Sequence, residues 1–243
     1  MSTEVTQNDI YNNNKSNVTS EDNYSKFNNF IFSDDLKLTG KFLHRFDYFS
    51  KTKHLPGDIV EIGVFKGSGM SSFLKFIQVY APNSNKKVIG FDIFDTVDAA
   101  TILNNDSTID KKAMTAIYDR VDKNELTLEF VADRLKKTKV SEDKFILVRG
   151  DVEVTVKKFA DENPGFRVAL LYIDVDIARP TYVALKYLWD RVLPGGYIIF
   201  DEYEYHKFSE STGVDEFMKE RGLKCKIRTT NWMAPTAYIR KPR

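Results

Sequence analysis

Apolar and polar positions follow two different patterns along this chain. Short continuous apolar runs, bounded by turn residues, are typical of strands that are buried on both faces of a sheet. We expect strands at residues 59–62, 87–92, 145–148, 167–173 and 197–200. Between these runs, apolar residues recur every three or four positions, as they do on one face of a helix. The alternation predicts an α/β fold with a mostly parallel, doubly wound sheet.

The helical pattern is clear ahead of the first strand. Within residues 34–53, Phe42, Phe46 and Phe49 have the spacing that one helical face gathers. Further helices are expected at residues 70–77, 152–160, 181–192 and 214–221.

The two ends of the chain differ in character. Residues 1–28 are polar and rich in Asn, Ser, Asp and Glu, so we expect a disordered tail ahead of one domain, residues 29–243. Near the other end, the Pro-Gly-Gly segment 193–196 predicts a turn. Residues 224–228 and 237–240 resemble an antiparallel hairpin that closes the domain.

Residues 96–140 are more numerous than a simple crossover between parallel strands needs. They hold a polar turn at residues 104–107 and helical stretches, the last at residues 125–137. An insertion here would lie above the C-terminal edge of the sheet. We expect it to form a lid or an oligomer contact.

Composition narrows the classes of function. The chain has 36 Lys and Arg against 35 Asp and Glu, a formal charge of +1, which leaves no basic footprint for nucleic acid. The single cysteine, Cys225, excludes an internal disulfide and fits a reducing cytoplasm. No apolar run approaches the ~20 residues of a membrane span, and no secretory signal is evident. We expect a cytoplasmic protein that acts on a small molecule.

A glycine-rich turn follows the first predicted strand. Gly63, Gly67 and Gly69 lead into the helix expected from residue 70. Glycines let a backbone pass close to a ligand, and a helix N-terminus offers free N–H groups, so the segment predicts a nucleotide-like ligand. Glu61 stands two positions before the first glycine, where a dinucleotide fold would keep an apolar residue. The alternative is a tight strand-to-helix turn with no ligand.

Asp92 closes the second predicted strand, about 30 residues after the glycine turn. Ribose hydroxyls are held at this position in such folds, because one carboxylate can accept hydrogen bonds from both. A helix cap or turn residue is the alternative for Asp92. Asp95 is a weaker candidate for the same role.

Carboxylates also close the fourth and fifth predicted strands. Asp174 follows one of them, and Asp201 and Glu202 follow the other. Adjacent parallel strands lie about 4.8 Å apart, so these side chains should meet and repel one another unless a cation intervenes. Oxygen ligands without thiols favour Mg²⁺, with Mn²⁺ or Ca²⁺ as alternatives. Otherwise they are helix caps and loop carboxylates screened by water.

The combination of motifs resembles the macrocin O-methyltransferase family, from about residue 40 to the C-terminus. The pattern Glu61-x-Gly63-x-x-x-Gly67 resembles the first motif of class I S-adenosylmethionine (SAM) methyltransferases. The matching segments are residues 56–64, 90–92, 150–155, 174–176 and 194–202. The resemblance implies a Rossmann-like class I methyltransferase fold with SAM as cofactor.

The resemblance also assigns site residues. It implies that SAM is bound by Glu61, Gly63, Gly67, Ser68, Asp92, Gly150, Asp151 and Val152, with Asp151 near the adenine amine. It implies that Asp174, Asp201 and Glu202 hold the Mg²⁺ ion. Members of this family methylate sugar hydroxyls of macrolides and related natural products, and they suggest a homo-oligomer.

This chain departs from the family pattern at the acceptor side. Glu202 stands where the family usually has Asp. Ala178 and Pro180 stand where the family usually has Tyr and Ser, while Thr181 agrees. The particular sugar is therefore not assigned by the resemblance.

The sequence thus predicts metal-assisted methyl transfer from SAM to a sugar hydroxyl. The acceptor would be a nucleotide sugar, a glycosylated natural product or a polysaccharide precursor. Asp174 is the first choice for the base that takes the hydroxyl proton, and Asp176 and His206 are alternatives.

Other functions remain open at this point. A metal-dependent O-methyltransferase of a catechol or phenol would use the same carboxylates. An NAD-dependent oxidoreductase would need Gly-x-Gly-x-x-Gly, which the first turn lacks. A non-catalytic SAM-binding scaffold would have no need of converging carboxylates.

Overall fold

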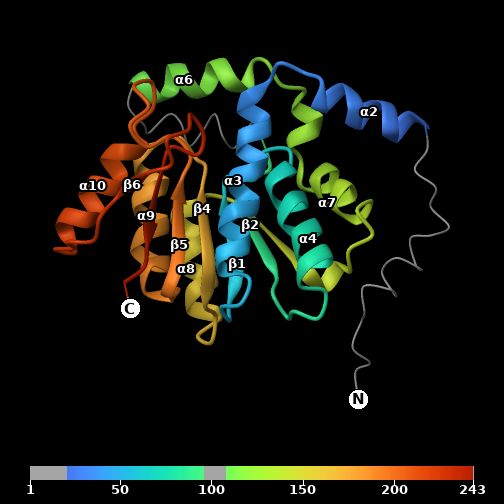
Figure 1. Ribbon diagram of the computed structural model, residues 1–243. Helices are drawn as coiled ribbons and strands as arrows, with labels where there is room; N and C mark the ends of the chain where they lie inside the picture. Colours follow the sequence, from blue (N-terminus) through green and yellow to red (C-terminus); the bar gives the residue numbers. More distant parts are fainter. Residues whose placement is uncertain (1–20, 96–107, 243) are drawn as a thin grey trace.

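A seven-stranded sheet lies at the centre of the structure (Figure 1). The computed structural model describes residues 21–95 and 108–242 of the chain. The strands are β1 (Asp58–Ile62), β2 (Val88–Asp92), β3 (Phe145–Arg149), β4 (Val168–Ile173), β5 (Val192–Phe200), β6 (Arg228–Thr229) and β7 (Ala237–Arg240). Their order is β3-β2-β1-β4-β5-β7-β6. β1 to β5 are parallel and β7 is antiparallel to both of its neighbours, so the predicted fold class is confirmed.

Helices cover both faces of this sheet: α3 (Leu36–Thr52), α4 (Ser68–Tyr80) and α7 (Leu128–Lys136) on one face, and α8 (Val152–Glu162), α9 (Ala178–Leu188) and α10 (Glu210–Glu220) on the other. Two further helices, α2 (Glu21–Ile31) and α6 (Thr108–Tyr118), lie outside these layers. Short 3₁₀ helices are η1 (Lys123–Leu126), η2 (Glu142–Lys144) and η3 (Trp189–Arg191). Figure 1 shows α3 and α4 in front of the sheet and α6 across its upper edge.

Two apolar cores result, one on each face of the sheet. Leu171 and Tyr172 are neighbours in β4 and point to opposite faces, as strand geometry requires. Leu171 packs in the core beneath α8, α9 and α10, which includes Phe217. Tyr172 packs in the core beneath α3, α4 and α7, which includes Phe49 and Phe73. Burial on both faces explains why β4 is a continuous apolar run.

Residues 193–196, expected to form a turn, lie within β5. Val192 pairs with Val168, and regular pairing resumes at Tyr197 opposite Leu170, so the intervening residues bulge from the ladder. Pro194 has no N–H to donate and Gly195 has a φ of +85°, both of which suit a bulge. The preceding helix accordingly ends at Leu188 rather than at residue 192.

Residues 21–28, expected to be disordered, are helical in the structure. They belong to α2, and residues 1–20 lie outside the described part of the chain. α2 has no buried residue, but Phe30 in its last turn lines the cavity described below. The following helix, α3, starts after Asp35, whose carboxylate accepts a hydrogen bond from the N–H of Leu38 as an N-cap.

The insertion at residues 96–140 is described from residue 108 onward, so its predicted polar turn at 104–107 lies outside the described residues. The last predicted helical stretch is observed as η1 and α7. α6 lies over the edge at which the parallel strands end (Figure 1), and Met114, Ile117 and Tyr118 line the cavity there. A lid or oligomer role stays a prediction. Within residues 21–95 and 108–242, no helix has the length and apolarity to cross a bilayer.

Candidate active site

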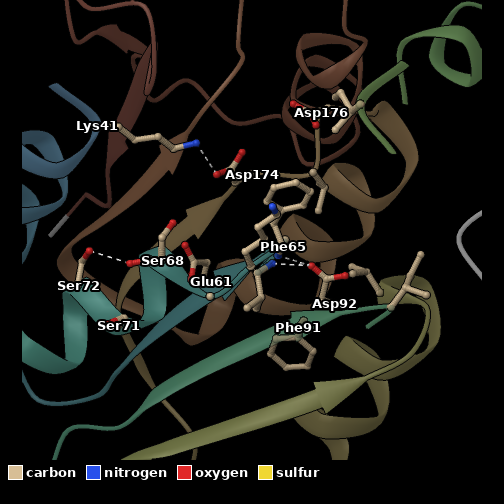
Figure 2. A pocket seen from close by; sticks show the side chains of 18 of the residues that line it. Lys41, Glu61, Phe65, Ser68, Ser71, Ser72, Phe91, Asp92, Asp174 and Asp176 are labelled. Atoms are coloured by element: carbon tan, nitrogen blue, oxygen red, sulfur yellow. Dashed lines mark hydrogen bonds and ion pairs between the residues drawn. The ribbon is translucent and has the colours of Figure 1, made fainter. Parts of the chain in front are cut away.

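A cavity of about 950 Å³ opens at the C-terminal ends of β1, β2 and β4 (Figure 2). This edge holds the point at which strand order reverses, where α/β proteins bind their ligands. The predicted site residues on its wall are Glu61, Gly63, Gly67, Ser68, Asp92, Asp151, Val152, Asp174 and Asp176. The structure therefore joins the expected cofactor residues and part of the acidic edge in one cavity.

The turn after β1 requires glycine at two positions. Gly63 has a φ of +90°, and a Cβ there would lie 1.9 Å from the carbonyl oxygen of Asp174. Gly67 has a φ of +83° and is the N-cap of α4. A side chain at Gly63 would clash with the backbone of Asp174, and the positive φ at both positions would strain any other residue. Glycine therefore lets the turn stay close to the strand ends and leaves the cavity open.

Glu61 lies under this turn and is 1% exposed. Its Oε1 accepts a hydrogen bond from Nη2 of Arg45 at 3.3 Å. A Cβ on Gly69 would lie 1.7 Å from the same Oε1, so the glycine lets the start of α4 rest against the carboxylate. Its Oε2 is buried and has no hydrogen-bond partner within the described residues. Burial raises the pKa of Glu61 to about 7, although Arg45 opposes this effect.

The unpartnered Oε2 of Glu61 is the observation that fits the cofactor. A buried carboxylate oxygen without a donor is costly, and a cationic group of a ligand would satisfy it. The amino-acid end of SAM carries an ammonium group. The residues of the glycine turn therefore fit SAM.

The carboxylate of Asp92, expected to bind ribose hydroxyls, accepts hydrogen bonds from backbone N–H groups of the protein. Its Oδ2 accepts the backbone N–H groups of Val64 and Phe65, both at 2.7 Å (Figure 2). Its Oδ1 accepts the N–H of Phe94 at 3.3 Å. Asp92 thus holds the glycine turn, because the end of β2 faces the residues that follow β1. Hydrogen bonding of Asp92 to ribose stays a prediction.

The turn between β3 and α8 contributes the opposite wall. Asp151 is the N-cap of α8 and accepts the N–H of Glu153 at 2.8 Å. Asp151 and Val152 line the cavity, whereas Gly150, with a φ of +127°, does not. A role of this turn at the adenine stays a prediction.

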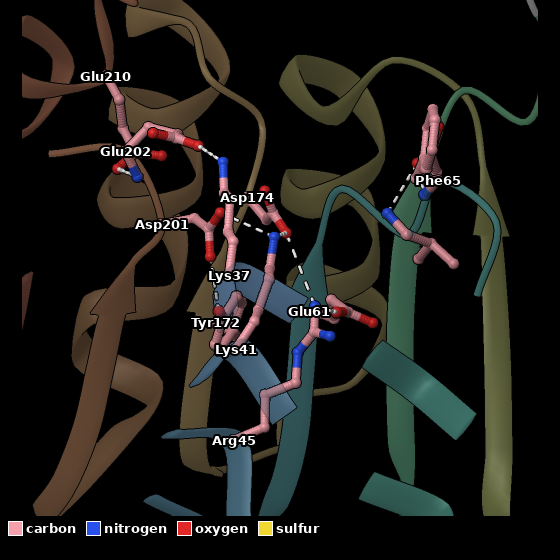
Figure 3. Close-up of polar contacts among 12 residues, drawn as sticks. Lys37, Lys41, Arg45, Glu61, Phe65, Tyr172, Asp174, Asp201, Glu202 and Glu210 are labelled. Atoms are coloured by element: carbon pink, nitrogen blue, oxygen red, sulfur yellow. Dashed lines mark hydrogen bonds and ion pairs between the residues drawn. The ribbon is translucent and has the colours of Figure 1, made fainter. Parts of the chain in front are cut away.

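The acidic edge contains a cation that belongs to the protein itself. Nζ of Lys41 lies 2.7 Å from Oδ2 of Asp174 and 2.8 Å from Oδ2 of Asp201 (Figure 3). Asp201 is 1% exposed, and its Oδ1 accepts the hydroxyl of Tyr172 at 2.6 Å. The carboxylates at the ends of β4 and β5 therefore converge, with an ammonium group between them.

Two more cations flank this ammonium. Nζ of Lys37 lies 3.5 Å from Oε1 of Glu202, and Nη2 of Arg45 lies 3.7 Å from Oδ2 of Asp174. The Oε2 of Glu202 is buried and has no partner in the described ranges. Burial, and then Asp201, raise the pKa of Glu202 to about 7.

Charge pairing sets the protonation states at the centre of the edge. Burial alone would lower the pKa of Lys41, but Asp174 and Asp201 outweigh it and raise that pKa. Burial alone would raise the pKa of Asp174, but Lys41 and then Arg45 outweigh it and hold that pKa below its ordinary value. Lys41 is therefore an ammonium and Asp174 a carboxylate.

Lys37, Lys41 and Arg45 were not predicted from the sequence. All three lie in α3 at intervals of four residues, which places them on one face of the helix. This spacing was visible in the sequence, but the phenylalanines of the same segment gave the stronger signal, that of its apolar face. Those phenylalanines hold α3 in place: Phe42 and Phe46 each lie 5.3 Å from Phe76 of α4, between ring centroids.

In this arrangement the predicted metal site is not formed. Within residues 21–95 and 108–242, no three His, Cys, Asp or Glu side chains are grouped so that they could hold a metal ion. The space that Asp174 and Asp201 enclose is taken by Nζ of Lys41. The residues as arranged therefore do not fit Mg²⁺, Mn²⁺ or Ca²⁺.

The candidate bases are placed very differently. His206 is exposed and does not line the cavity. Asp174 is engaged by Lys41. Asp176 lines the cavity with a φ of +65° and makes no side-chain hydrogen bond or ion pair with any described residue. Burial, and then Asp174 and Glu202, raise the pKa of Asp176 well above its ordinary value.

Comparison with solved structures supports the fold. The calicheamicin methyltransferase CalS11 has a TM-score of 0.69 and 20% identity, over 98% of this chain and 94% of CalS11. The O-methyltransferase NovP has a TM-score of 0.68 and 19% identity, over 83% of this chain and 79% of NovP. At these identities the likeness concerns the fold.

Comparison of sequences shows the family. A Streptomyces olivaceus protein, 8-demethyl-8-(2,3-dimethoxy-alpha-L-rhamnosyl)-tetracenomycin-C 4'-O-methyltransferase, is 26% identical over 152 residues. The match covers 61% of this chain and 54% of that protein, about half of the relative's length. The sequence pattern of the macrocin O-methyltransferase family (TylF) matches residues 46–241, which contain the glycine turn and the whole sheet. The chain belongs to the macrocin O-methyltransferase family.

Proposed function

We propose that this protein transfers a methyl group from SAM to a hydroxyl of a sugar-containing acceptor. The observation that carries the proposal is the single cavity in which the unpartnered Oε2 of Glu61 and the side chain of Asp176 both lie. Family membership supports methyl transfer. The S. olivaceus relative is named as an O-methyltransferase of a rhamnosyl compound, and a CalS11 structure is described as a TDP-rhamnose 3'-O-methyltransferase. These names support a sugar as the acceptor class.

The cofactor would be held by residues at the ends of β1, β2 and β3. Glu61 would accept a hydrogen bond from the ammonium group of SAM, and Asp151 would accept one from the adenine amine. The turn from Gly63 to Gly67 would lie against the amino-acid portion of SAM. Asp92 would keep the turn in place. When bound, SAM would supply an electrophilic methyl group on its sulfonium sulfur, and S-adenosylhomocysteine (SAH) would be the leaving product of its transfer to the acceptor oxygen.

The proton of the acceptor hydroxyl would go to Asp176. Its carboxylate faces the cavity without a partner among the described residues, whereas the carboxylate of Asp174 is held by Lys41. A carboxylate that faces the cavity can accept the hydroxyl proton, whereas one held by an ammonium group is a weaker base. We therefore assign the base to Asp176 rather than to Asp174, the first choice from the sequence. Asp174 and Lys41 would shape the acceptor side of the cavity.

Magnesium does not enter the proposed reaction, because Lys41 takes the position between the expected ligands. The same arrangement weighs against a catechol methyltransferase that chelates two hydroxyls through a metal. We also propose that the protein has no nucleic-acid partner, in line with its near-zero formal charge of +1. A cytoplasmic location and a homo-oligomeric state are further parts of the proposal.

Calorimetry with SAH and with NAD⁺ tests the cofactor. We expect SAH to bind with roughly micromolar affinity, about −8 kcal/mol, and NAD⁺ not to bind. Incubation with SAM and a panel of nucleotide sugars and glycosylated natural products, read by mass spectrometry, tests the acceptor. Binding of NAD⁺ but not of SAH would contradict the proposed function.

A further inference from the structure

The carboxylates of Asp174 and Asp201 are bridged by one nitrogen atom. The distances of 2.7 and 2.8 Å from Nζ of Lys41 are those of charge-assisted hydrogen bonds from an ammonium group. The side chain of Lys41 is 17% exposed, so this contact lies inside the site rather than on its rim. The contacts of Lys41 with Asp174 and Asp201 are therefore part of the interior of the site.

We infer that the Lys41 ammonium is the resident cation of this carboxylate pair and takes the place of a divalent metal ion. This inference rests on the proposed function for its meaning in methyl transfer, because it concerns the acceptor side of the same cavity. It assigns Lys41 as a positioning residue, which holds the side chains of Asp174 and Asp201 together at the ends of β4 and β5.

Several contacts leave little room for a metal ion beside Lys41. A divalent ion a few ångströms from an ammonium would be repelled strongly in a buried site. Oδ1 of Asp201 is already engaged by the hydroxyl of Tyr172. Oδ1 of Asp174 and the buried Oε2 of Glu202 make no hydrogen bond with a described residue, but a metal ion on either carboxylate would lie close to the ammonium group of Lys41 or Lys37.

The position of Lys41 is set by the packing of α3. Phe42 and Phe46 of that helix lie against Phe76 of α4, so α3 is held in front of the sheet and the side chain of Lys41 reaches the carboxylates at the ends of β4 and β5 (Figure 3). The family match begins at residue 46, five residues beyond Lys41, so the ammonium comes from outside the matched segment. The inferred cation therefore depends on how α3 packs over the sheet.

Manganese titration followed by electron paramagnetic resonance tests the inference without an acceptor or methyl transfer. The variant is Lys41→Met, which keeps the length of the side chain and removes its charge. The matched control is Lys51→Met, on the same helix, where the lysine pairs with Asp47 at the surface. Thermal unfolding of each variant shows whether it is folded.

We expect weak Mn²⁺ binding to the wild type and to Lys51→Met, and binding at least about tenfold tighter to Lys41→Met, because two uncompensated carboxylates then attract a cation. Asp201→Asn added to Lys41→Met should abolish the gain. Equal Mn²⁺ affinity of wild type and folded Lys41→Met would overturn the inference.

If Lys41→Met does not fold, Lys41→Gln replaces it. Mn²⁺ binding by the wild type also tests the inference without either variant. Tight Mn²⁺ binding by the wild type that is lost in Asp201→Asn would show that a metal displaces the ammonium, and would overturn the inference. Weak binding by the wild type supports it. Failure here is distinguishable from failure of the proposed function, which SAH binding tests separately.

Discussion

At the scale of single residues, the site is defined by which carboxylates have partners. Glu61 has one oxygen against Arg45 and one without a partner among the described residues. Asp174 is neutralised by Lys41, whereas Asp176 faces the cavity. Carboxylates of the same type thus have different chemistry because their neighbours differ.

Glu61→Gln should weaken SAH binding. The substitution keeps the shape of the side chain but removes the charge that would receive the ammonium group. A hydrogen bond between charged groups contributes about 1.5–3 kcal/mol, so we expect a loss of affinity in that range by calorimetry. For the wild type, SAH affinity should rise as the pH rises toward and past 7, because the pKa of Glu61 is about 7. A pH-independent affinity, or an unchanged affinity of Glu61→Gln, would contradict this role.

The same substitution should change how stability of the unliganded protein depends on pH. The folded pKa of Glu61, about 7, lies above its ordinary value of 4.5, so the folded protein binds the proton more tightly than the unfolded chain. Its contribution to stability is therefore present below about pH 4.5 and is lost as the pH rises through 7. The melting temperature of Glu61→Gln minus that of the wild type should therefore increase as the pH rises from about 5 to about 8, roughly the span of the titration. Glu202 titrates in the same range, but it is present in both proteins.

Asp176→Asn should lower the rate of methyl transfer by about 10²–10⁴-fold, the usual cost of losing a general base. SAH affinity should be nearly unchanged, because Glu61 and the glycine turn are intact. Asp174→Asn is the comparison: it deprives Lys41 of one partner, so it should lower the melting temperature as well as activity. Full activity of Asp176→Asn in a steady-state assay would exclude it as the base.

At the scale of elements, the approach of α4 to β1 shapes the proposed cofactor side of the cavity. The helix begins at Ser68, and Gly69 lies against the carboxylate of Glu61. The contact requires a residue without Cβ, because a Cβ at this position would lie 1.7 Å from Oε1 of Glu61. The first turn of α4 and the buried carboxylate therefore depend on each other.

Gly69→Ala should destabilise the protein by about 1–3 kcal/mol, the range for overpacking a filled site, and should weaken SAH binding. Chemical denaturation and calorimetry measure the two effects. The control is Gly165→Ala, where a Cβ would meet nothing within 4 Å. The control should change stability by no more than about 0.5 kcal/mol. Equal effects of the two substitutions would show that Glu61 and α4 adjust without cost.

At the scale of the whole molecule, the proposed acceptor side of the cavity is assembled from segments far apart in the chain. Lys41 of α3 meets Asp174, 133 residues later, and Asp201, 160 residues later. α6 and the end of α2 contribute further residues to the same cavity. Charge balance at the site is therefore a property of the folded chain and of no single motif.

From this balance we expect methyl transfer to survive removal of divalent ions. Once an acceptor is known, the wild-type rate after treatment with EDTA should equal the untreated rate, and added Mg²⁺ should have no effect. The physical reason is that the ammonium group of Lys41 already bridges the two carboxylates that a metal ion would bridge. Loss of activity with EDTA and its return with Mg²⁺ would contradict this expectation.

Much of the fold and part of the site followed from the sequence by itself. The apolar runs predicted β1 to β5, since a strand buried on both faces leaves a local pattern. The glycines after β1 and the acids after β4 and β5 predicted where a ligand would lie, because parallel strands end at one edge. Each of these signals lies within a short segment of the chain, so it can be recognised in the sequence without knowledge of the fold.

Only the tertiary structure decided which partners the site residues have. Asp92, expected at the ribose, already accepts the backbone N–H groups of Val64 and Phe65 across two adjacent strands. Asp174 and Asp201 were expected to hold a metal ion, but α3 brings Lys41 between them. A carboxylate at a strand end can accept hydrogen bonds from backbone, from a lysine or from a ligand, or it can bind a metal. The choice depends on which element packs over it, and that packing joins residues that no local pattern connects.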